Sequence, residues 1–357
     1  MHRPHRRLAL AAVSAVAVLG AGALTAPAAQ AAGPDAPILT KWANPGVAKL
    51  PSGGYVMTHT TSWNKPGAFA TAPQPNGPWK RTGTTLLTGT PAWAKSAKQK
   101  RTVWAPSIIR GTNGRWVLFY SALVPGKGSQ RCIGTGTSSR PTGPFVPDSR
   151  PLSCFKGSGA KPKDLIPNEG TTSLIDATPA VVNGQTVLTY KTSHGYTRNG
   201  QKLWHTTIRM VALNPARPNQ IIANPVNRNG RSVQLTSKRH KYIEENPSLI
   251  HRGGKYVLFT SWGWYGTHDQ YWTQSRTNKS LWTGWPTKPR RVTFPKGTNT
   301  WGQGNAQAIA TSPGTWALFW NGQEPGFKRG QGPKHLYVGK LGWKNGHPVV
   351  SKVLKRR

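Results

Sequence analysis

Acidic side chains are rare in this chain, and two of them stand where they could act together. The 357 residues contain 9 Asp and Glu against 48 Lys and Arg. Asp176 lies eight residues before a glycine that opens a short apolar run, and Glu245 lies nine residues before another. Two carboxylates around one pocket can share acid–base work, because one can hold a proton for a leaving oxygen while the other stays ionised. We expect Glu245 to be the proton donor and Asp176 to raise its pKa. The alternative is that each acid pairs with one of the many bases.

The two glycines belong to a fivefold repeat of strand-like runs. Each run continues with β-branched or aromatic residues, as in Gly114-Arg115-Trp116-Val117-Leu118-Phe119, which is typical of the second strand of a hairpin. Spacings of 61, 70, 70 and 60 residues separate the first glycines of the runs, which are Gly53, Gly114, Gly184, Gly254 and Gly314. Five such units predict an all-β fold, a five-bladed β-propeller that forms a single domain over residues 32–357. A β-sandwich is the alternative, but it does not require the period.

In a propeller the first strand of each blade starts beside the central axis, where ligands bind. We call the residue at this start the slot residue. Counting back nine residues from each glycine gives Asn44, Ala105, Ile175, Glu245 and Asn305. The third repeat is one residue shorter, so its slot is assigned to Asp176 instead. Asp176 and Glu245 are therefore expected at equivalent positions facing one funnel, with the amides of Asn44 and Asn305 beside them.

The N-terminus predicts a cleaved signal peptide over residues 1–31. Arg3, Arg6 and Arg7 precede an apolar run from residue 8 to 24, and Ala29-Gln30-Ala31 supplies small residues for cleavage. An uncleaved membrane anchor is the alternative, and no later stretch is long and apolar enough to span a bilayer. We expect a secreted, extracellular protein, either free or associated with the cell wall.

Export permits a disulfide between the two cysteines, Cys132 and Cys154, and two buried thiols are the alternative. The mature chain would carry 45 basic against 9 acidic residues, a net charge of +36. Such a charge attracts polyanions such as anionic cell-wall polymers. No recognisable nucleic-acid-binding module accompanies the charge, so specific nucleic-acid binding is not expected. The histidines lack zinc-ligand spacing, and we expect neither a metal nor another cofactor.

Flat aromatic faces suit the apolar faces of sugar rings. Trp42 and Trp104 lie next to slot residues in the sequence. We therefore expect both to line sugar-binding subsites, together with Asn305, although packing between blades would explain an average tryptophan equally well.

At these residues the chain resembles glycoside hydrolase family 43, the arabinanase, arabinofuranosidase and β-xylosidase group. Val103-Trp104-Ala105-Pro106 with the run from Gly114 resembles the second blade of that family. Ile175-Asp176-Ala177 is similar to the strand that carries its pKa-modulating Asp, and Glu245-Asn246-Pro247 is similar to its Glu-x-Pro general-acid motif. The resemblance implies a five-bladed propeller and an inverting glycosidase that acts on arabinose- or xylose-containing polysaccharide.

The resemblance also marks two departures. The family's general base is an Asp followed by Pro in the first blade, whereas this chain has Asn44-Pro45, and an amide cannot take the proton of water. A Gly-x-Gly-His motif that helps to hold a metal in arabinan-cleaving members reads Gly302-Gln303-Gly304-Asn305 here. Asp269 and Glu169 are candidates for a substitute base. The alternative function is a catalytically silent propeller that binds glycan or an anionic wall polymer.

Overall fold

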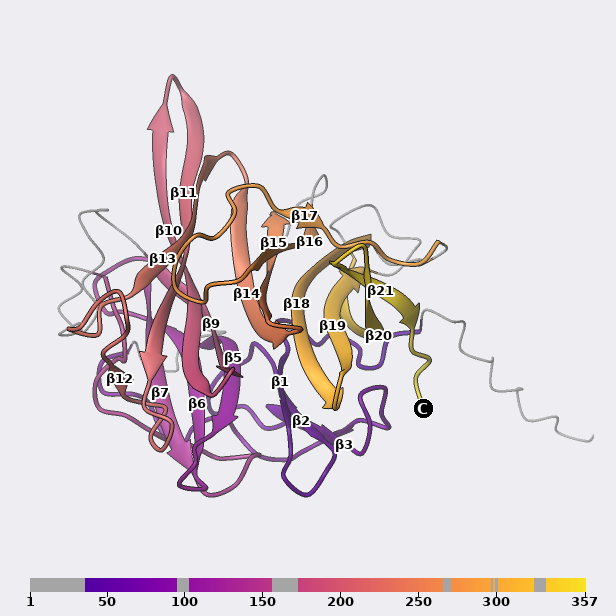
Figure 1. Ribbon diagram of the computed structural model, residues 1–357. Helices are drawn as coiled ribbons and strands as arrows, with labels where there is room; N and C mark the ends of the chain where they lie inside the picture. Colours follow the sequence, from indigo (N-terminus) through magenta and orange to yellow (C-terminus); the bar gives the residue numbers. More distant parts are fainter. Residues whose placement is uncertain are drawn as a thin grey trace, which may run out of the picture. The chain divides into compact units, whose positions relative to one another are not determined.

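The protein is all β in the part of the chain that the structure describes. The computed structural model describes residues 36–94, 103–155, 173–265, 271–296, 298, 301–323 and 332–357, so the predicted signal peptide lies outside it. Residues Ala32–Arg357 form one compact unit, in which successive strands make five antiparallel sheets (Figure 1). This is the predicted five-bladed β-propeller. Over these residues no helix has the length and apolar character needed to cross a bilayer.

Four of the blades are four-stranded meanders in which each strand pairs with the next. Blade one contains β1 (Gly46–Lys49), β2 (Tyr55–Thr58), β3 (Phe69–Ala72) and β4 (Lys80–Arg81). Blade two contains β5 (Val103–Arg110), β6 (Trp116–Leu123), β7 (Arg131–Ser138) and β8 (Val146–Pro147). Blade four contains β14 (Ile243–Arg252), β15 (Lys255–Gly263), β16 (Tyr271–Asn278) and β17 (Arg290–Arg291). Blade five contains β18 (Trp301–Ser312), β19 (Thr315–Gln323), β20 (Lys334–Lys344) and β21 (His347–Val353). The five predicted runs are the second strands of the blades, as the hairpin pattern indicated.

Blade three differs from the others in its length and in a fifth strand. It contains β9 (Ser173–Val182), β10 (Gln185–Arg198), β11 (Gln201–Leu213), β12 (Ile221–Ile222) and β13 (Val233–His240). Both β12 and β13 pair with β11. The second strand, β10, has 14 residues, whereas its counterpart β6 in blade two has 8. The β10–β11 hairpin therefore projects beyond the other strands (Figure 1).

The ring is closed by strand contacts and by hydrogen bonds from both ends of the chain. The inner strands β1, β5, β9, β14 and β18 contact one another in this order, and β18 also contacts β1. Leu336 of β20 receives the backbone N–H of Ile38 at 2.8 Å and donates its own to Leu39 at 2.9 Å. At the other end, the backbone N–H of Arg357 donates to the carbonyl of Asn76 in blade one at 3.1 Å. These bonds join the first and last blades.

Apolar side chains fill the spaces between neighbouring blades. Met57 of β2 and Phe319 of β19 belong to one buried cluster between blades one and five. Val187 of β10 and Leu258 of β15 belong to another between blades three and four. Because the blades bury their faces against one another, the inner strands are held in fixed positions around the axis.

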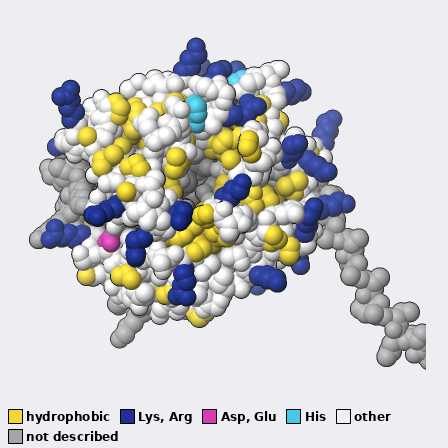
Figure 2. Space-filling view, turned by 60° about the horizontal axis from the view of Figure 1, so that its bottom comes forward, with side chains coloured by type: hydrophobic (Ala, Val, Ile, Leu, Met, Phe, Trp, Pro, Cys, Tyr) yellow, Lys and Arg dark blue, Asp and Glu magenta, His cyan; other side chains and the backbone are white. Residues whose placement is uncertain are grey.

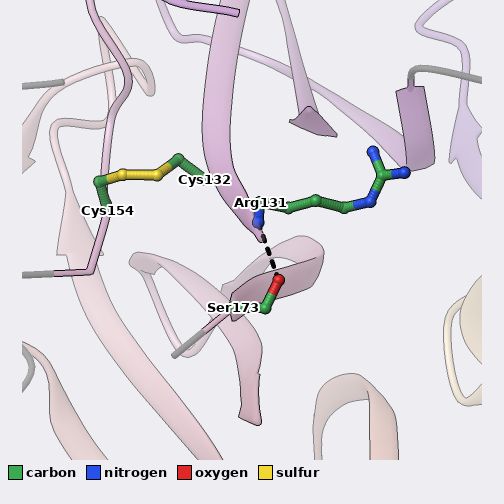
Figure 3. Close-up of a disulfide and its surroundings, with 4 residues drawn as sticks. All are labelled: Arg131, Cys132, Cys154 and Ser173. Atoms are coloured by element: carbon green, nitrogen blue, oxygen red, sulfur yellow. Dashed lines mark hydrogen bonds between the residues drawn. A yellow bond between two sulfur atoms is a disulfide. The ribbon is translucent and has the colours of Figure 1, made fainter. Parts of the chain in front are cut away.

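Cys132 and Cys154 form a disulfide, so the bridged alternative of the two predicted for these cysteines is the one in the structure (Figure 3). Their Cα atoms lie 4.6 Å apart. Next to the bridge, the backbone N–H of Arg131 donates to Ser173 Oγ at 2.9 Å (Figure 3). The bridge therefore ties the start of β7 to Cys154, and the hydrogen bond ties it to the start of β9, the inner strand of blade three.

Candidate active site

The start of each inner strand is marked by one non-glycine residue in the left-handed backbone region. Such residues are uncommon, because the Cβ atom crowds the backbone there. All five surround a small axial cavity of about 20 Å³. They are Asn44, Ala105, Asp176, Asn246 and Asn305, with φ of 53°, 43°, 61°, 53° and 52°. This backbone signature identifies the true slot residues of the five blades.

The signature corrects one predicted equivalence. In blade four the slot residue is Asn246, and Glu245 precedes it by one position. The count of nine fails because the first hairpins of blades three and four have two-residue turns, between paired residues Val182 and Gln185 in one and Arg252 and Lys255 in the other. Blade five also has a short turn, but an extra bulge near Ala310 restores the count. Asp176 and Glu245 are therefore neighbours in the pocket without being repeat equivalents.

A second ring of side chains surrounds the slots, seven residues after each glycine of the repeat. It consists of Thr60, Ser121, Lys191, Ser261 and Asn321. Three of its members accept the backbone N–H of the slot residue in the next blade. Ala105 donates to Thr60 Oγ1 at 3.1 Å, Asn305 to Ser261 Oγ at 2.8 Å, and Asn44 to Asn321 Oδ1 at 2.9 Å. The ring thus fixes the slot backbone across blade boundaries.

Ser121 Oγ and Lys191 do not accept a slot N–H, and Lys191 cannot do so, because an ammonium group has no lone pair to accept a hydrogen bond. The backbone N–H of Asn246, which would be its partner, instead donates to Asp176 Oδ2 at 3.1 Å. Lys191 turns to Glu245, and its Nζ lies 2.7 Å from Glu245 Oε2. Sequence reasoning missed this lysine, although the aligned repeats show one charged residue in a column of otherwise neutral ones.

Glu245 is held between two donors at the wall of the pocket. It is 6% exposed, and besides Lys191 it receives the Tyr271 hydroxyl at 3.2 Å from Oε1. Burial, followed by the charge of Glu245, raises the pKa of Tyr271 well above its usual range, so the phenol keeps its proton. Gly304 leaves the space that the Tyr271 ring occupies, because a Cβ atom at Gly304 would collide with it. This contact gives the Gly-x-Gly motif a packing role.

Asp176 is buried beside this pair. Burial is the main cause that raises its pKa from 3.8 to about 7, and the charge of Glu245 adds to the rise. Lys191 and the hydrogen bond from Asn246 oppose it. Asp176 can therefore exchange a proton near neutral pH.

Asn44 lines the axial cavity, at the position where the family resemblance places a general base. Its Nδ2 donates to Thr60 Oγ1 at 2.8 Å, and its Oδ1 accepts a hydrogen bond from Asn305 Nδ2. Among the described residues that line the two cavities here, Asp176 and Glu245 are the only carboxylates. The proposed substitutes, Asp269 and Glu169, lie outside the described residues. Among the residues that the structure describes, no group of three His, Cys, Asp or Glu is arranged to hold a metal ion.

Above the axis a larger cavity of about 930 Å³ opens between blades one to four. One side carries Trp104, which is 39% exposed and has the Arg131 guanidinium 3.7 Å from its ring centre. Trp204 of the long hairpin and Trp264 also line the cavity, with ring centres 5.3 Å apart in an edge-to-face arrangement. The cavity therefore combines aromatic surfaces with the carboxylates of Glu245 and Asp176. Trp104, which the sequence analysis selected as a sugar-binding residue, lines this cavity, and so does Trp204, which it did not select.

Trp42 requires a correction. Its side chain is 0% exposed, its Nε1 donates to the carbonyl of Thr58 at 3.1 Å, and its ring stacks on His59 with centres 4.0 Å apart. It is a core residue and offers no face to a sugar. Asn305 does reach the axis, where its amide bonds Asn44, Asn246 and Tyr271.

Comparison with known proteins gives one family and a set of similar structures. The model of glycosyl hydrolases family 43 matches residues 35–348. A thermostable family-43 glycoside hydrolase is similar in structure, with a TM-score of 0.63, 18% identity, and coverage of 89% of this chain and 95% of the other. An endo-1,4-β-xylanase from Bacteroides thetaiotaomicron has a TM-score of 0.61 at 20% identity, with coverage of 90% and 98%. An exo-1,5-α-L-arabinanase from a bovine ruminal metagenomic library has a TM-score of 0.58 at 19% identity, with coverage of 87% and 96%. No curated protein sequence matches.

Proposed function

The chain belongs to glycosyl hydrolases family 43, and from this premise we propose that it is a secreted glycosidase that cleaves O-glycosyl bonds in arabinose- or xylose-containing polysaccharide with inversion. The observation that carries the proposal is the meeting of Glu245 and Asp176 in one aromatic-lined cavity. The xylanase and arabinanase among the similar structures support the choice of pentose polymers. Secretion rests on the signal-peptide pattern of residues 1–31.

In this proposal Glu245 donates the proton to the leaving oxygen, and Tyr271 keeps the carboxyl in place. Asp176 modulates Glu245 through its charge and fixes the backbone of Asn246, the residue after the acid. An inverting reaction also needs a group that takes a proton from water on the opposite face of the sugar. Asn44 holds water or sugar at that position without accepting the proton. Asp269 and Glu169 remain the candidates for the base, since each lies four residues in sequence from a pocket-lining residue, Tyr265 and Ser173 respectively.

A second candidate function is glycan binding without turnover. It is favoured by Asn44, because both ends of its amide are already bonded, to Thr60 and to Asn305. The basic surface then adds a contact for an anionic cell-wall polymer. Figure 2 shows one face of the molecule, on which Lys and Arg side chains are spread widely and acidic side chains are almost absent.

Hydrolysis of nitrophenyl arabinofuranoside and xyloside, and of arabinan and xylan, tests both candidates. Wild type is assayed beside Glu245→Gln and Asn44→Asp, with Asn345→Asp in an exposed turn of blade five as the matched control. Activity in wild type that falls by about 10²–10⁴ in Glu245→Gln supports the glycosidase. Activity that appears only in Asn44→Asp supports the silent binder. Activity that Glu245→Gln leaves intact contradicts the assigned proton donor.

A further inference from the structure

The ring of residues that surrounds the slots has one charged member, Lys191, and this member touches the proposed proton donor. Thr60, Ser261 and Asn321 each accept a slot N–H from the next blade. Lys191 occupies the same repeat position in blade three, but it points its ammonium group at Glu245. At this repeat position, blade three therefore places a charged side chain in the catalytic pocket, whereas the other four blades have neutral side chains.

The geometry at Lys191 is that of a buried ion pair. Its side chain is 3% exposed and that of Glu245 is 8% exposed, with 2.7 Å between Nζ and Oε2. At this distance and depth the attraction between an ammonium and a carboxylate is much stronger than in water. The pair exists only while Glu245 is ionised, whereas a general acid must carry its proton when the glycosidic bond breaks.

We propose that Lys191 is a positioning residue that keeps Glu245 in its carboxylate form, so that Glu245 can donate a proton only after its contact with Lys191 is broken. The inference rests on the proposed function for the role of Glu245. It adds a second restraint on turnover, independent of Asn44. Breaking the contact lets Glu245 take a proton from solvent and pass it to the leaving oxygen, which leaves the carboxylate behind.

The groups that face Glu245 come from three strands. Lys191 on β10 stabilises its negative charge, as does the hydrogen bond from Tyr271 on β16. Asp176 on β9 opposes that charge when it is ionised. Of these groups only Lys191 carries a positive charge, so removing it is the change that most favours the protonated form of Glu245.

A direct test is to monitor the ionisation of Glu245 by carbon NMR of its side-chain carboxyl as the pH is changed. The chain contains only four glutamates, so the signal can be assigned with Glu245→Gln. Lys191→Ser installs the residue found at the same position in two other blades, and Lys191→Met removes the charge while it keeps the length. Lys191→Arg keeps the charge. Lys202→Ser is the control, because Lys202 lines the same cavity with its Nζ 5.5 Å above the Trp204 ring.

We expect the Glu245 signal to titrate at higher pH in Lys191→Ser and Lys191→Met than in wild type, Lys191→Arg and Lys202→Ser. Equal titration in all of these proteins overturns the inference. In the Asn44→Asp background we expect Lys191→Ser to raise hydrolysis at pH 7 by about tenfold and to extend the active range to higher pH. A loss of activity with an unchanged pH profile would also overturn it, because that result describes a structural lysine. If no variant hydrolyses any glycan, the proposed function fails and the titration still decides the role of Lys191.

Discussion

Two adjacent glutamates of β14 form two buried ion pairs with opposite properties. Glu244 is 1% exposed, and the Arg276 guanidinium contacts both of its carboxylate oxygens. Its Oε1 also receives Thr260 and Gln274, at 2.8 and 3.3 Å. The Glu245 carboxylate contacts Lys191 and Tyr271 and lines the large cavity. Successive residues of a strand point to opposite faces, so one position in the sequence separates the two environments.

The difference shows that burial and ion pairing do not by themselves identify a reactive carboxylate. We call Glu244 and Arg276 the closed pair and Glu245 and Lys191 the open pair. In the closed pair all side-chain partners of the carboxylate come from blade four, and Glu244 lines neither of the two cavities at the axis. In the open pair the partners come from blades three and four, and both Lys191 and Glu245 line the large cavity. The closed pair therefore stabilises a blade, whereas the open pair is available for chemistry.

Breaking the closed pair is expected to have the largest effect on stability. Arg276→Met leaves the Glu244 carboxylate buried without its cation, which costs about 3–5 kcal/mol in the free energy of unfolding. Urea unfolding followed by tryptophan fluorescence measures the loss. The reference is Glu244→Gln/Arg276→Met, in which no buried charge remains and most of the stability returns. A loss below about 1 kcal/mol in the single variant would show that the pair is not a structural unit.

The second prediction concerns Asp176, which lies beside the open pair and makes the stability of the protein depend on pH. Because its pKa is raised to about 7 from 3.8, the folded protein retains a proton that the unfolded chain loses between these values. Its contribution to stability is complete below about pH 4 and is lost as the pH rises towards 7. Asp176→Asn removes this titration and keeps an oxygen for the N–H of Asn246. Urea unfolding from pH 4 to 8 is expected to show wild type losing stability relative to the variant. A constant difference over that range contradicts the raised pKa.

The smallest effect is expected for Trp104, whose ring lines the large cavity. Trp104→Ala removes a half-exposed ring that lines the cavity, so glycan affinity falls by about 1 kcal/mol, or about fivefold in Kd, with little change in stability. Isothermal titration with arabino- and xylo-oligosaccharides measures the affinity. Trp343→Ala is the matched control, because Trp343 also packs under an arginine, Arg252, at 3.9 Å, away from the cavity. Equal losses in both variants would remove Trp104 from the binding surface.

Most of the fold was predictable because its signals are local. A turn glycine followed by a β-branched or aromatic run indicates each hairpin, and the repeat distance gives the number of blades. The slot residues were predictable to within one position. The error at Glu245 arose because turn length and bulges vary between blades, and these depend on strand register, which a count from one glycine does not contain.

The site was less predictable because its contacts join distant segments. Lys191 and Glu245 are 54 residues apart, and Asn44 and Asn305 are 261 apart. Trp42 and Trp104 occupy similar positions in the sequence, yet one is buried against His59 and the other lines the cavity. Adjacent position in the sequence does not reveal which neighbouring blade covers a side chain.

The sequence by itself determined the all-β class, the five blades and the presence of Asp176 and Glu245 near one axis, since periodicity and turn chemistry are properties of short segments. Only the tertiary structure decided that Asn246 is the slot residue of blade four, that Trp42 belongs to the core, and that Lys191 neutralises Glu245. These features depend on how one blade packs against the next. That packing sets burial, and burial sets the strength of every charge and hydrogen bond in the pocket.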